Sequence, residues 1–184
     1  MKNLGTVKLE TERLILRRVT AKDVFAVYTN WASDKLTSRY LEWEAHENMD
    51  VTCAYVAHVI SSYSKGAYDW FVEVKETGDL IGSISAVHID DKNGAYVEIG
   101  YCYGSKFWGN GYASEALRRV CNFFLLECEY NIVEARHISG NPASGRVMQK
   151  AGMKLDAVLR NRRINKDTKE INDLVVYSIT KEEL

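Results

Sequence analysis

A short glycine-containing turn, residues 106–113 (KFWGNGYA), constrains this chain more than any other segment of its sequence. The apolar stretch before it, residues 95–103, is typical of a strand, and residues 112–128 form an amphipathic helical pattern. Glycines at such a junction let backbone amides approach a ligand closely, and the start of a helix favours an anion such as a pyrophosphate. A tight turn that binds nothing would use the same two glycines, so the turn alone leaves both interpretations open.

The turn differs from the two best-known phosphate-binding motifs. No Gly-Lys-Ser/Thr triplet follows it, which argues against a P-loop, and Ser114 stands where a dinucleotide fingerprint would have its third glycine. A metal site is not indicated either. The four histidines are scattered along the chain, and no two of the four cysteines have Cys-x-x-Cys spacing. We therefore expect no metal and four reduced thiols.

The rest of the chain predicts one α/β domain covering residues 1–184. Thr20 and Asp23 have the spacing of a capping box and open a helix that ends near residue 30. A second helix is predicted over residues 48–65, and its expected inner face consists of Val51, Tyr55, His58, Val59 and Ser62. Two more helices are expected over residues 112–128 and 141–152, with a hairpin turn at 91–94. The expected strands are residues 13–19, 69–75, 80–89, 95–103, 132–138, 154–164 and 171–180.

The charge balance narrows the classes of partner. The chain has 24 basic and 25 acidic residues, a formal net charge of −1, which provides no positive field for gripping nucleic acid. Residues 1–8 lack the apolar core of a signal peptide, and no stretch approaches the roughly 20 apolar residues of a membrane span. We expect a soluble cytoplasmic protein without nucleic-acid or membrane partners.

Five segments, in order along the chain, resemble one enzyme family. They are Thr11–Arg17 (TERLILR), Glu98–Tyr101 (EIGY), Lys106-x-x-Gly109-x-Gly111, Asn141-x-x-Ser144 followed by residues 150–153 (KAGM), and Asp173–Tyr177 (DLVVY). Together they resemble the GNAT superfamily of N-acetyltransferases and, within it, the branch of ribosomal-protein N-acetyltransferases (RimJ/RimL-like). The resemblance covers nearly the whole chain. Lys106 departs from the family pattern, in which Gln or Arg usually opens the loop, and it keeps the charge but loses the planar donor fork.

The resemblance implies a mixed, mostly antiparallel central sheet of about seven strands with about four helices packed around it. It also implies that acetyl-CoA is the cosubstrate. The pantetheine arm would bond to the backbone of residues 99–103 like an added strand. The residues that the resemblance assigns to coenzyme binding are Ile99, Tyr101, Lys106, Trp108, Gly109, Asn110, Gly111, Tyr112, Ala113, Asn141 and Ser144.

Amide formation from a thioester suggests two catalytic candidates. The attacking amine must lose a proton, and the resemblance makes Glu98 the general base, often acting through water. The departing thiolate is helped by a proton, for which Ser144 is the candidate donor. Each residue also has an ordinary structural interpretation: Glu98 as a solvated or ion-paired strand carboxylate, Ser144 as a first-turn hydroxyl, and Asn141 as a helix N-cap.

The expected activity is transfer of an acetyl group to a primary amine, either a protein N-terminal α-amine or a small-molecule amine. Cys102 lies near the expected thioester, but a covalent cysteine route would need an adjacent base, and the sequence indicates none. Two alternatives belong to other classes: an acyl-CoA-binding sensor or scaffold without catalysis, and a nucleotide-binding module. The sequence leaves the acceptor, the acyl chain length and the choice between monomer and homodimer open.

Overall fold

The computed structural model describes residues 1–92 and 95–184, and in these residues eight strands form one mixed, mostly antiparallel sheet. The strands are β1 (Leu9–Glu10), β2 (Leu14–Arg17), β3 (Asp69–Val74), β4 (Leu80–Asp90), β5 (Tyr96–Tyr103), β6 (Ile132–Ile138), β7 (Lys154–Ile164) and β8 (Ile171–Thr180). Their order is β1-β2-β3-β4-β5-β6-β8-β7, and β5 and β6 run parallel. The predicted mixed α/β fold is confirmed. The strand added to the seven expected ones is β1, a two-residue strand that pairs with β2 and is too short for a sequence pattern.

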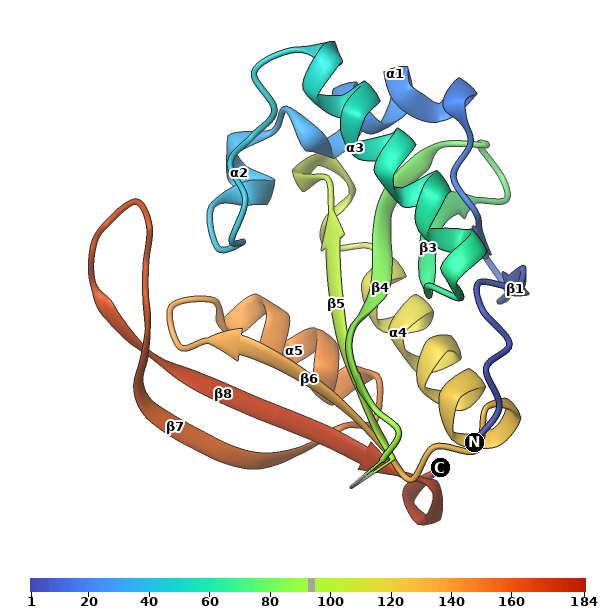
Figure 1. Ribbon diagram of the computed structural model, residues 1–184. Helices are drawn as coiled ribbons and strands as arrows, with labels where there is room; N and C mark the ends of the chain where they lie inside the picture. Colours follow the sequence, from blue (N-terminus) through green and yellow to red (C-terminus); the bar gives the residue numbers. More distant parts are fainter. Residues whose placement is uncertain (93–94) are drawn as a thin grey trace. The chain divides into compact units, whose positions relative to one another are not determined.

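The helices lie between these strands along the chain (Figure 1). They are α1 (Val24–Val27), α2 (Lys35–Ser38), α3 (Met49–Ser62), α4 (Tyr112–Asn122) and α5 (Pro142–Lys150). The chain divides into two compact units. We call residues 3–85 and 101–112 the N-terminal unit, and residues 1–2, 86–100 and 113–184 the C-terminal unit. Residues 93 and 94, half of the predicted 91–94 turn, lie outside the described residues.

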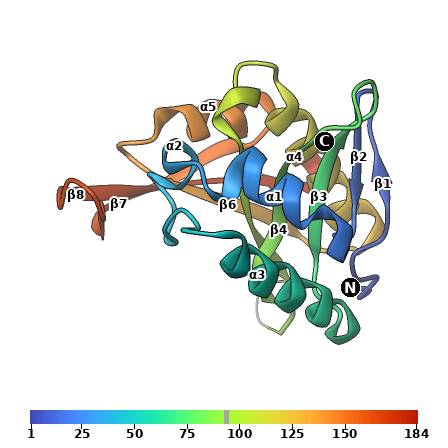
Figure 2. The ribbon, with the colours of Figure 1, turned by 90° about the horizontal axis from the view of Figure 1, so that it is seen from above.

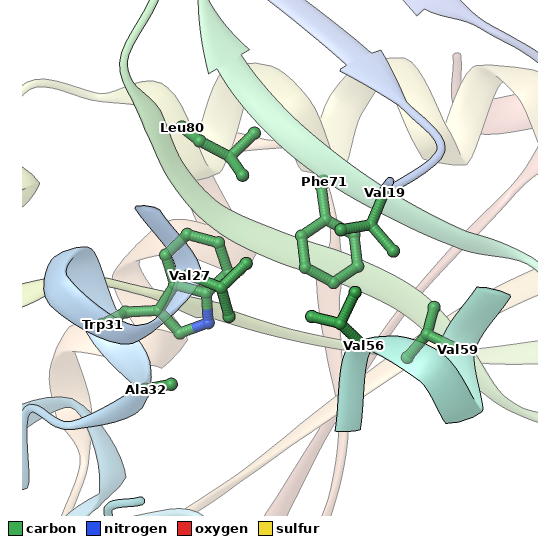
Figure 3. Packing of buried hydrophobic residues seen from close by; sticks show 8 residues of the cluster. All are labelled: Val19, Val27, Trp31, Ala32, Val56, Val59, Phe71 and Leu80. Carbon is green, nitrogen blue, oxygen red and sulfur yellow. The ribbon is translucent and has the colours of Figure 1, made fainter. Parts of the chain in front are cut away.

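The N-terminal unit is built around a hydrophobic core beneath its helices. Thr20 and Asp23 form the predicted capping box, which opens a 3-10 turn that continues into α1 and a π-helical segment, Tyr28–Ala32. Helices α1 and α3 lie side by side (Figure 2). Their apolar side chains meet those of β3 and β4 in a core whose buried members are Val19, Val27, Trp31, Ala32, Val56, Val59, Phe71 and Leu80 (Figure 3). Burial of these side chains stabilises the unit, since each removes its apolar surface from water.

Helix α3 and the 3-10 turn after it, Tyr63–Lys65, together cover the predicted range 48–65, but the buried face differs from the predicted one. Asn48 caps its start, accepting a hydrogen bond from the Val51 amide, and Gly66 ends the following 3-10 turn in a left-handed conformation. The fully buried residues are Thr52, Val56 and Val59. The prediction that Val51 and His58 face inward is wrong, because both side chains are exposed, although Val59 is buried as expected.

The C-terminal unit combines β6, β8 and β7 with helices α4 and α5. The amphipathic pattern predicted over residues 112–128 is confirmed, because one apolar face of this segment is buried: Ala116, Leu117, Val120, Phe124 and Leu125. The helix changes to a π-helical segment over Phe123–Glu127. Strand β8 pairs antiparallel with both β6 and β7, and α5 contacts β6 (Figure 1). These elements, together with residues 96–100 of β5, hold the second group of candidate site residues.

Candidate active site

The glycine turn of the N-terminal unit has the backbone conformation that its sequence demands. Gly109 and Gly111 both have left-handed backbones, with φ of +83° and +79°, and α4 begins at the next residue, Tyr112. A Cβ atom on Gly109 would meet nothing within 4 Å, so conformation rather than crowding requires glycine there. Left-handed residues in a turn at a helix start are the setting in which backbone amides converge on an anion.

Two predicted binding residues close this turn by bonding back to its own backbone. The indole Nε1 of Trp108 donates to the Tyr103 carbonyl at 2.7 Å. The Asn110 amide Nδ2 donates to the carbonyls of Phe107 and Trp108 at 3.1 and 3.3 Å. The Trp108 side chain is nevertheless 53% exposed, so it does not pack in the core. These bonds fix the turn and leave the indole at the surface beside it.

Arg13 braces the same turn from the start of the chain. Its Nη1 donates to the Asn110 carbonyl at 3.0 Å, and its guanidinium carbon lies 4.8 Å from the centre of the Tyr112 ring. The arginine therefore contacts the last loop residues and the first residue of α4. Arg13 belongs to the TERLILR segment that resembles the family, and this segment is the one sequence signal for its role.

Lys106 and Gly104 tie the beginning of the turn to Asn30. The Lys106 ammonium donates to Asn30 Oδ1 at 2.8 Å, and Asn30 Nδ2 donates to the Leu80 carbonyl at 2.6 Å. Gly104 approaches the Asn30 carbonyl so closely that any Cβ at position 104 would overlap it. The Lys106 charge thus lies at the turn, as predicted, but an amide oxygen already accepts a bond from it.

Asp34 holds the next residue of the turn. Its carboxylate caps α2 by accepting from the Leu36 amide at 2.9 Å, and it also accepts from the Ser105 amide at 3.1 Å. Burial raises the pKa of Asp34, but hydrogen bonds from Ser105, Thr37 and the Leu36 amide lower it more. The carboxylate is therefore charged at neutral pH and anchors the turn to the start of α2.

Glu98 lies in the C-terminal unit beside a second carboxylate. In the parallel register of β5 and β6, Glu98 is directly opposite Glu134. Arg136 connects the two, with Nη1 3.4 Å from Glu98 Oε2 and Nη2 3.1 Å from Glu134 Oε2. Burial lowers the pKa of Arg136, but the hydrogen bond to Glu134 and the charge of Glu98 raise it more. Glu98 is thus an ion-paired strand carboxylate, the structural interpretation that its sequence position also allowed.

Asn141 and Ser144 start helix α5, as predicted. Asn141 Oδ1 accepts from the Ser144 amide at 3.4 Å and acts as the N-cap, with Pro142 in the first turn. The Asn141 side chain therefore performs the capping function that competed with a coenzyme contact. Ser144 is half-buried in the first turn of the helix.

A close contact beneath α5 went unnoticed in the sequence. A Cβ on Gly145 would lie 2.7 Å from His137 Nε2, so the glycine allows the imidazole to lie against the helix. The His137 ring also stacks on Tyr177, with ring centres 5.9 Å apart, and the Tyr177 hydroxyl accepts from Gln149 at 2.9 Å. His137 is a packed residue that helps to seat the helix start carrying Ser144.

The remaining predicted residues lie on β5 and at the start of α4. Ile99 is buried, Tyr101 and Ala113 are half-buried, and the rings of Tyr101 and Tyr103 lie 6.3 Å apart. Between Ile99 and Tyr101, a Cβ on Gly100 would lie 2.8 Å from a methyl group of Val87. Glycine therefore allows the neighbouring side chain to cover the β5 backbone at this position.

The Cys102 thiol lacks the surroundings of a nucleophile. Burial raises the pKa of Cys102, and its Sγ lies 3.4 Å from the hydroxyl of Ser83. A neutral hydroxyl cannot convert a buried thiol into the reactive thiolate. In the described parts of the chain, residues 1–92 and 95–184, no three His, Cys, Asp or Glu side chains form a metal-binding group. Over the same ranges, no helix has the length and apolar character needed to cross a bilayer.

Comparisons of the sequence with family models and with known proteins indicate the same enzyme family. The family model described as "Acetyltransferase (GNAT) domain" matches residues 13–154, more than half of the chain. The "Uncharacterized N-acetyltransferase YoaA" of Bacillus subtilis is 32% identical over 174 residues, covering 94% of this chain and 96% of that protein. Of these residues, the match includes Arg13, the glycine turn and the start of α5.

Solved structures have the same fold. An acetyltransferase of the GNAT family from Bacillus anthracis has a TM-score of 0.83 and 25% identity, covering 96% of this chain and all of that one. RimL, a ribosomal-protein acetyltransferase solved in complex with coenzyme A, has a TM-score of 0.82 and 18% identity, with 95% and 98% coverage. This chain belongs to the GNAT family and is an acetyl-CoA-dependent N-acetyltransferase.

Proposed function

We propose that this enzyme transfers the acetyl group of acetyl-CoA to a primary amine by direct attack, with Glu98 as general base. The observation that carries the proposal is the turn at residues 109–112, where two left-handed glycines precede the start of α4 and Arg13 braces the backbone. Amides at such a turn suit the pyrophosphate of the coenzyme. The binding residues are those named from the sequence, with Arg13 added as a support.

The reacting groups belong to β5 and α5. The amine nitrogen attacks the thioester carbonyl, the carbon–sulfur bond breaks, and coenzyme A leaves as a thiolate. Glu98 accepts the proton that the amine loses, directly or through one water. Ser144, in the first turn of α5, donates its hydroxyl proton to the departing thiolate and takes one back from water. Backbone amides of β5 between Ile99 and Tyr103 orient the pantetheine arm and polarise the thioester carbonyl.

The acceptor is a primary amine, either a protein N-terminal α-amine or a small molecule. Burial raises the pKa of the Cys102 thiol, so the reactive thiolate is disfavoured. This favours direct attack by the amine over an acetyl-cysteine intermediate. The near-neutral charge of the chain gives no support to a nucleic-acid partner. We propose that the enzyme works as a monomer or homodimer in the cytoplasm.

The test is free-thiol release from acetyl-CoA, measured against a panel of small amines and N-terminal peptides. Glu98→Gln should lower kcat by about 10²–10⁴-fold while leaving coenzyme affinity near that of the wild type. Gly111→Glu should abolish coenzyme binding, because it places a carboxylate and a strained backbone at the turn.

The matched control is Gly78→Glu. Gly78 has a similar left-handed backbone, with φ of +73°, and open space around it, but it lies in the β3–β4 turn. The Gly78→Glu variant should therefore retain acetyltransferase activity. Coenzyme binding without turnover against any amine would replace the proposal with the sensor or scaffold function.

A further inference from the structure

Two carboxylates and one guanidinium meet within the C-terminal unit. Glu98 and Glu134 are directly opposite each other on β5 and β6. Arg136 lies two residues beyond Glu134 on the same strand, so both side chains leave the same face of the sheet. The guanidinium reaches both carboxylates through different nitrogens, Nη1 to Glu98 and Nη2 to Glu134.

The three side chains are largely shielded from water. Their exposed fractions are 20% for Glu98, 21% for Glu134 and 31% for Arg136. Two carboxylates directly opposite on neighbouring strands repel each other, and in a shielded site such a pair tends to hold one proton. A guanidinium that stays charged at every pH of interest removes this tendency, because it attracts both anions.

Within residues 1–92 and 95–184, the surroundings supply no other cation to this cluster. Among the residues that the structure describes, Arg136 is the one cation paired with either carboxylate. The nearby titratable groups are Tyr96 on β5 and His88 on β4, whose rings lie 5.4 Å apart. Strand β8 presents Ser178 opposite Glu134 and Val176 opposite Arg136, and neither carries a charge.

We propose that Arg136 is a positioning residue for Glu98, and that Glu134 holds Arg136 in place. The inference rests on the proposed function, in which Glu98 must be ionised to take the amine proton. Arg136 offsets the repulsion between the two neighbouring carboxylates and fixes one oxygen of Glu98. Glu134 also pairs with the guanidinium. It therefore weakens the attraction of Arg136 for Glu98 and leaves Glu98 able to accept the amine proton.

Removal of Arg136 and removal of Glu134 should shift the pH dependence of kcat in opposite directions. Without Arg136, the two carboxylates retain one proton up to a higher pH, so the acidic limb of the kcat profile moves to higher pH. Without Glu134, Arg136 pairs with Glu98 alone, and the acidic limb moves to lower pH. Removing both leaves Glu98 without either neighbour and returns the limb toward the wild-type position.

The experiment measures kcat and KM for acetyl-CoA from pH 5 to 9 in wild type, Arg136→Met, Arg136→Lys, Glu134→Gln and the double variant Arg136→Met/Glu134→Gln. We expect the acidic limb to rise by about one pH unit in Arg136→Met. The kcat at pH 7 should also fall about tenfold, because Glu98 loses the contact that fixes its oxygen, while the KM for acetyl-CoA stays within about twofold. Arg136→Lys should recover part of the lost rate, since it restores a cation but not the two-pronged contact.

Glu98→Gln, measured beside them, separates this inference from the proposed function. A large loss of kcat in Glu98→Gln with unchanged pH profiles in the Arg136 and Glu134 variants overturns the positioning role and leaves Glu98 as the base. An unchanged Glu98→Gln overturns both. If Arg136→Met does not fold, Glu134→Gln still decides, because an acidic limb that stays at the wild-type pH contradicts the inference.

Discussion

Arg13 and Tyr112 are separated by more than half of the chain's length, yet the guanidinium of one lies 4.8 Å from the ring centre of the other. The same guanidinium donates to the carbonyl of Asn110. A residue from the segment before β2 thus holds the last turn before α4, where we propose that the coenzyme pyrophosphate binds. Loss of this contact should weaken coenzyme binding and leave the rate of the chemical step nearly unchanged.

Arg13→Ala should raise the KM for acetyl-CoA by about tenfold with a small change in kcat, since a charge-assisted hydrogen bond and a cation–π contact are lost. Steady-state kinetics and calorimetry with coenzyme A measure this. Arg18→Ala is the matched control, because Arg18 also covers a tyrosine ring, that of Tyr63 at 5.0 Å, and donates to a backbone carbonyl, that of Thr6. Equal losses of affinity in both variants would show a general loss of stability and contradict a role for Arg13 at the turn.

Gly109→Ala tests the backbone conformation of the turn. Alanine has the space it needs at this position, but a left-handed φ costs it about 1 kcal/mol, so the turn should relax and coenzyme affinity should fall. Gly78→Ala imposes the same backbone cost at an equally open turn between β3 and β4. Calorimetric titration of both variants should show weaker coenzyme binding only in Gly109→Ala, at similar melting temperatures. Wild-type affinity in Gly109→Ala would mean that the turn conformation is not needed for binding.

Gly145→Ala tests the contact beneath α5. The added methyl group would lie 2.7 Å from His137 Nε2, and the imidazole is held by its stacking on Tyr177. We expect a loss of about 1–3 kcal/mol in unfolding free energy, seen as a Tm lower by several degrees. The double variant Gly145→Ala/His137→Ala should lose less than the sum of the two single changes, because the overlap disappears with the ring. Simple additivity would show that the two residues do not interact.

The ion pairs at the start of α1 give stability a dependence on pH. Arg17 donates to both oxygens of Asp23 at 2.9 Å and to Glu73 at 2.8 Å. Burial raises the pKa of Asp23, but hydrogen bonds from Arg17 and Thr20 lower it more. A carboxyl whose pKa is lower in the folded state stabilises the protein above its unfolded pKa, about 3.9, and loses that contribution as the pH falls toward the folded value.

Asp23→Asn should therefore lower the unfolding free energy by about 1–3 kcal/mol at pH 7, and the difference from wild type should shrink below about pH 4. Urea unfolding at several pH values measures it. Asp156→Asn, at an exposed position of β7, is the control and should be close to wild type throughout. A difference that stays constant down to pH 3 would contradict the assignment of the effect to the Asp23 carboxylate.

The sequence was sufficient wherever one local pattern decides the structure. The bounds of α3, the inner face of α4, the Asn141 cap and the left-handed glycines of the turn all follow from spacing and from the conformational freedom of one residue type. The inner face of α3 did not follow, because a polar residue occupies it. Thr52 is buried with its hydroxyl 2.8 Å from His46 Nδ1, while the apolar Val51 is exposed.

The supporting residues of the site could not be predicted for a different reason. Arg13 meets Asn110 across 97 positions of sequence, and Arg136 meets Glu98 only because β5 and β6 are parallel in one particular register. Neither distance along the chain nor residue type carries that information. Glu98 was therefore identifiable as a candidate from its resemblance to a family segment, whereas the charges that surround it became visible only in the structure.

A crystal structure with coenzyme A bound would test the central claim most directly. Our account predicts that the diphosphate oxygens lie within hydrogen-bonding distance of the backbone amides of residues 109–112, with Arg13 still on Tyr112. A diphosphate bound elsewhere on the protein, with these amides turned away from it, would contradict the account.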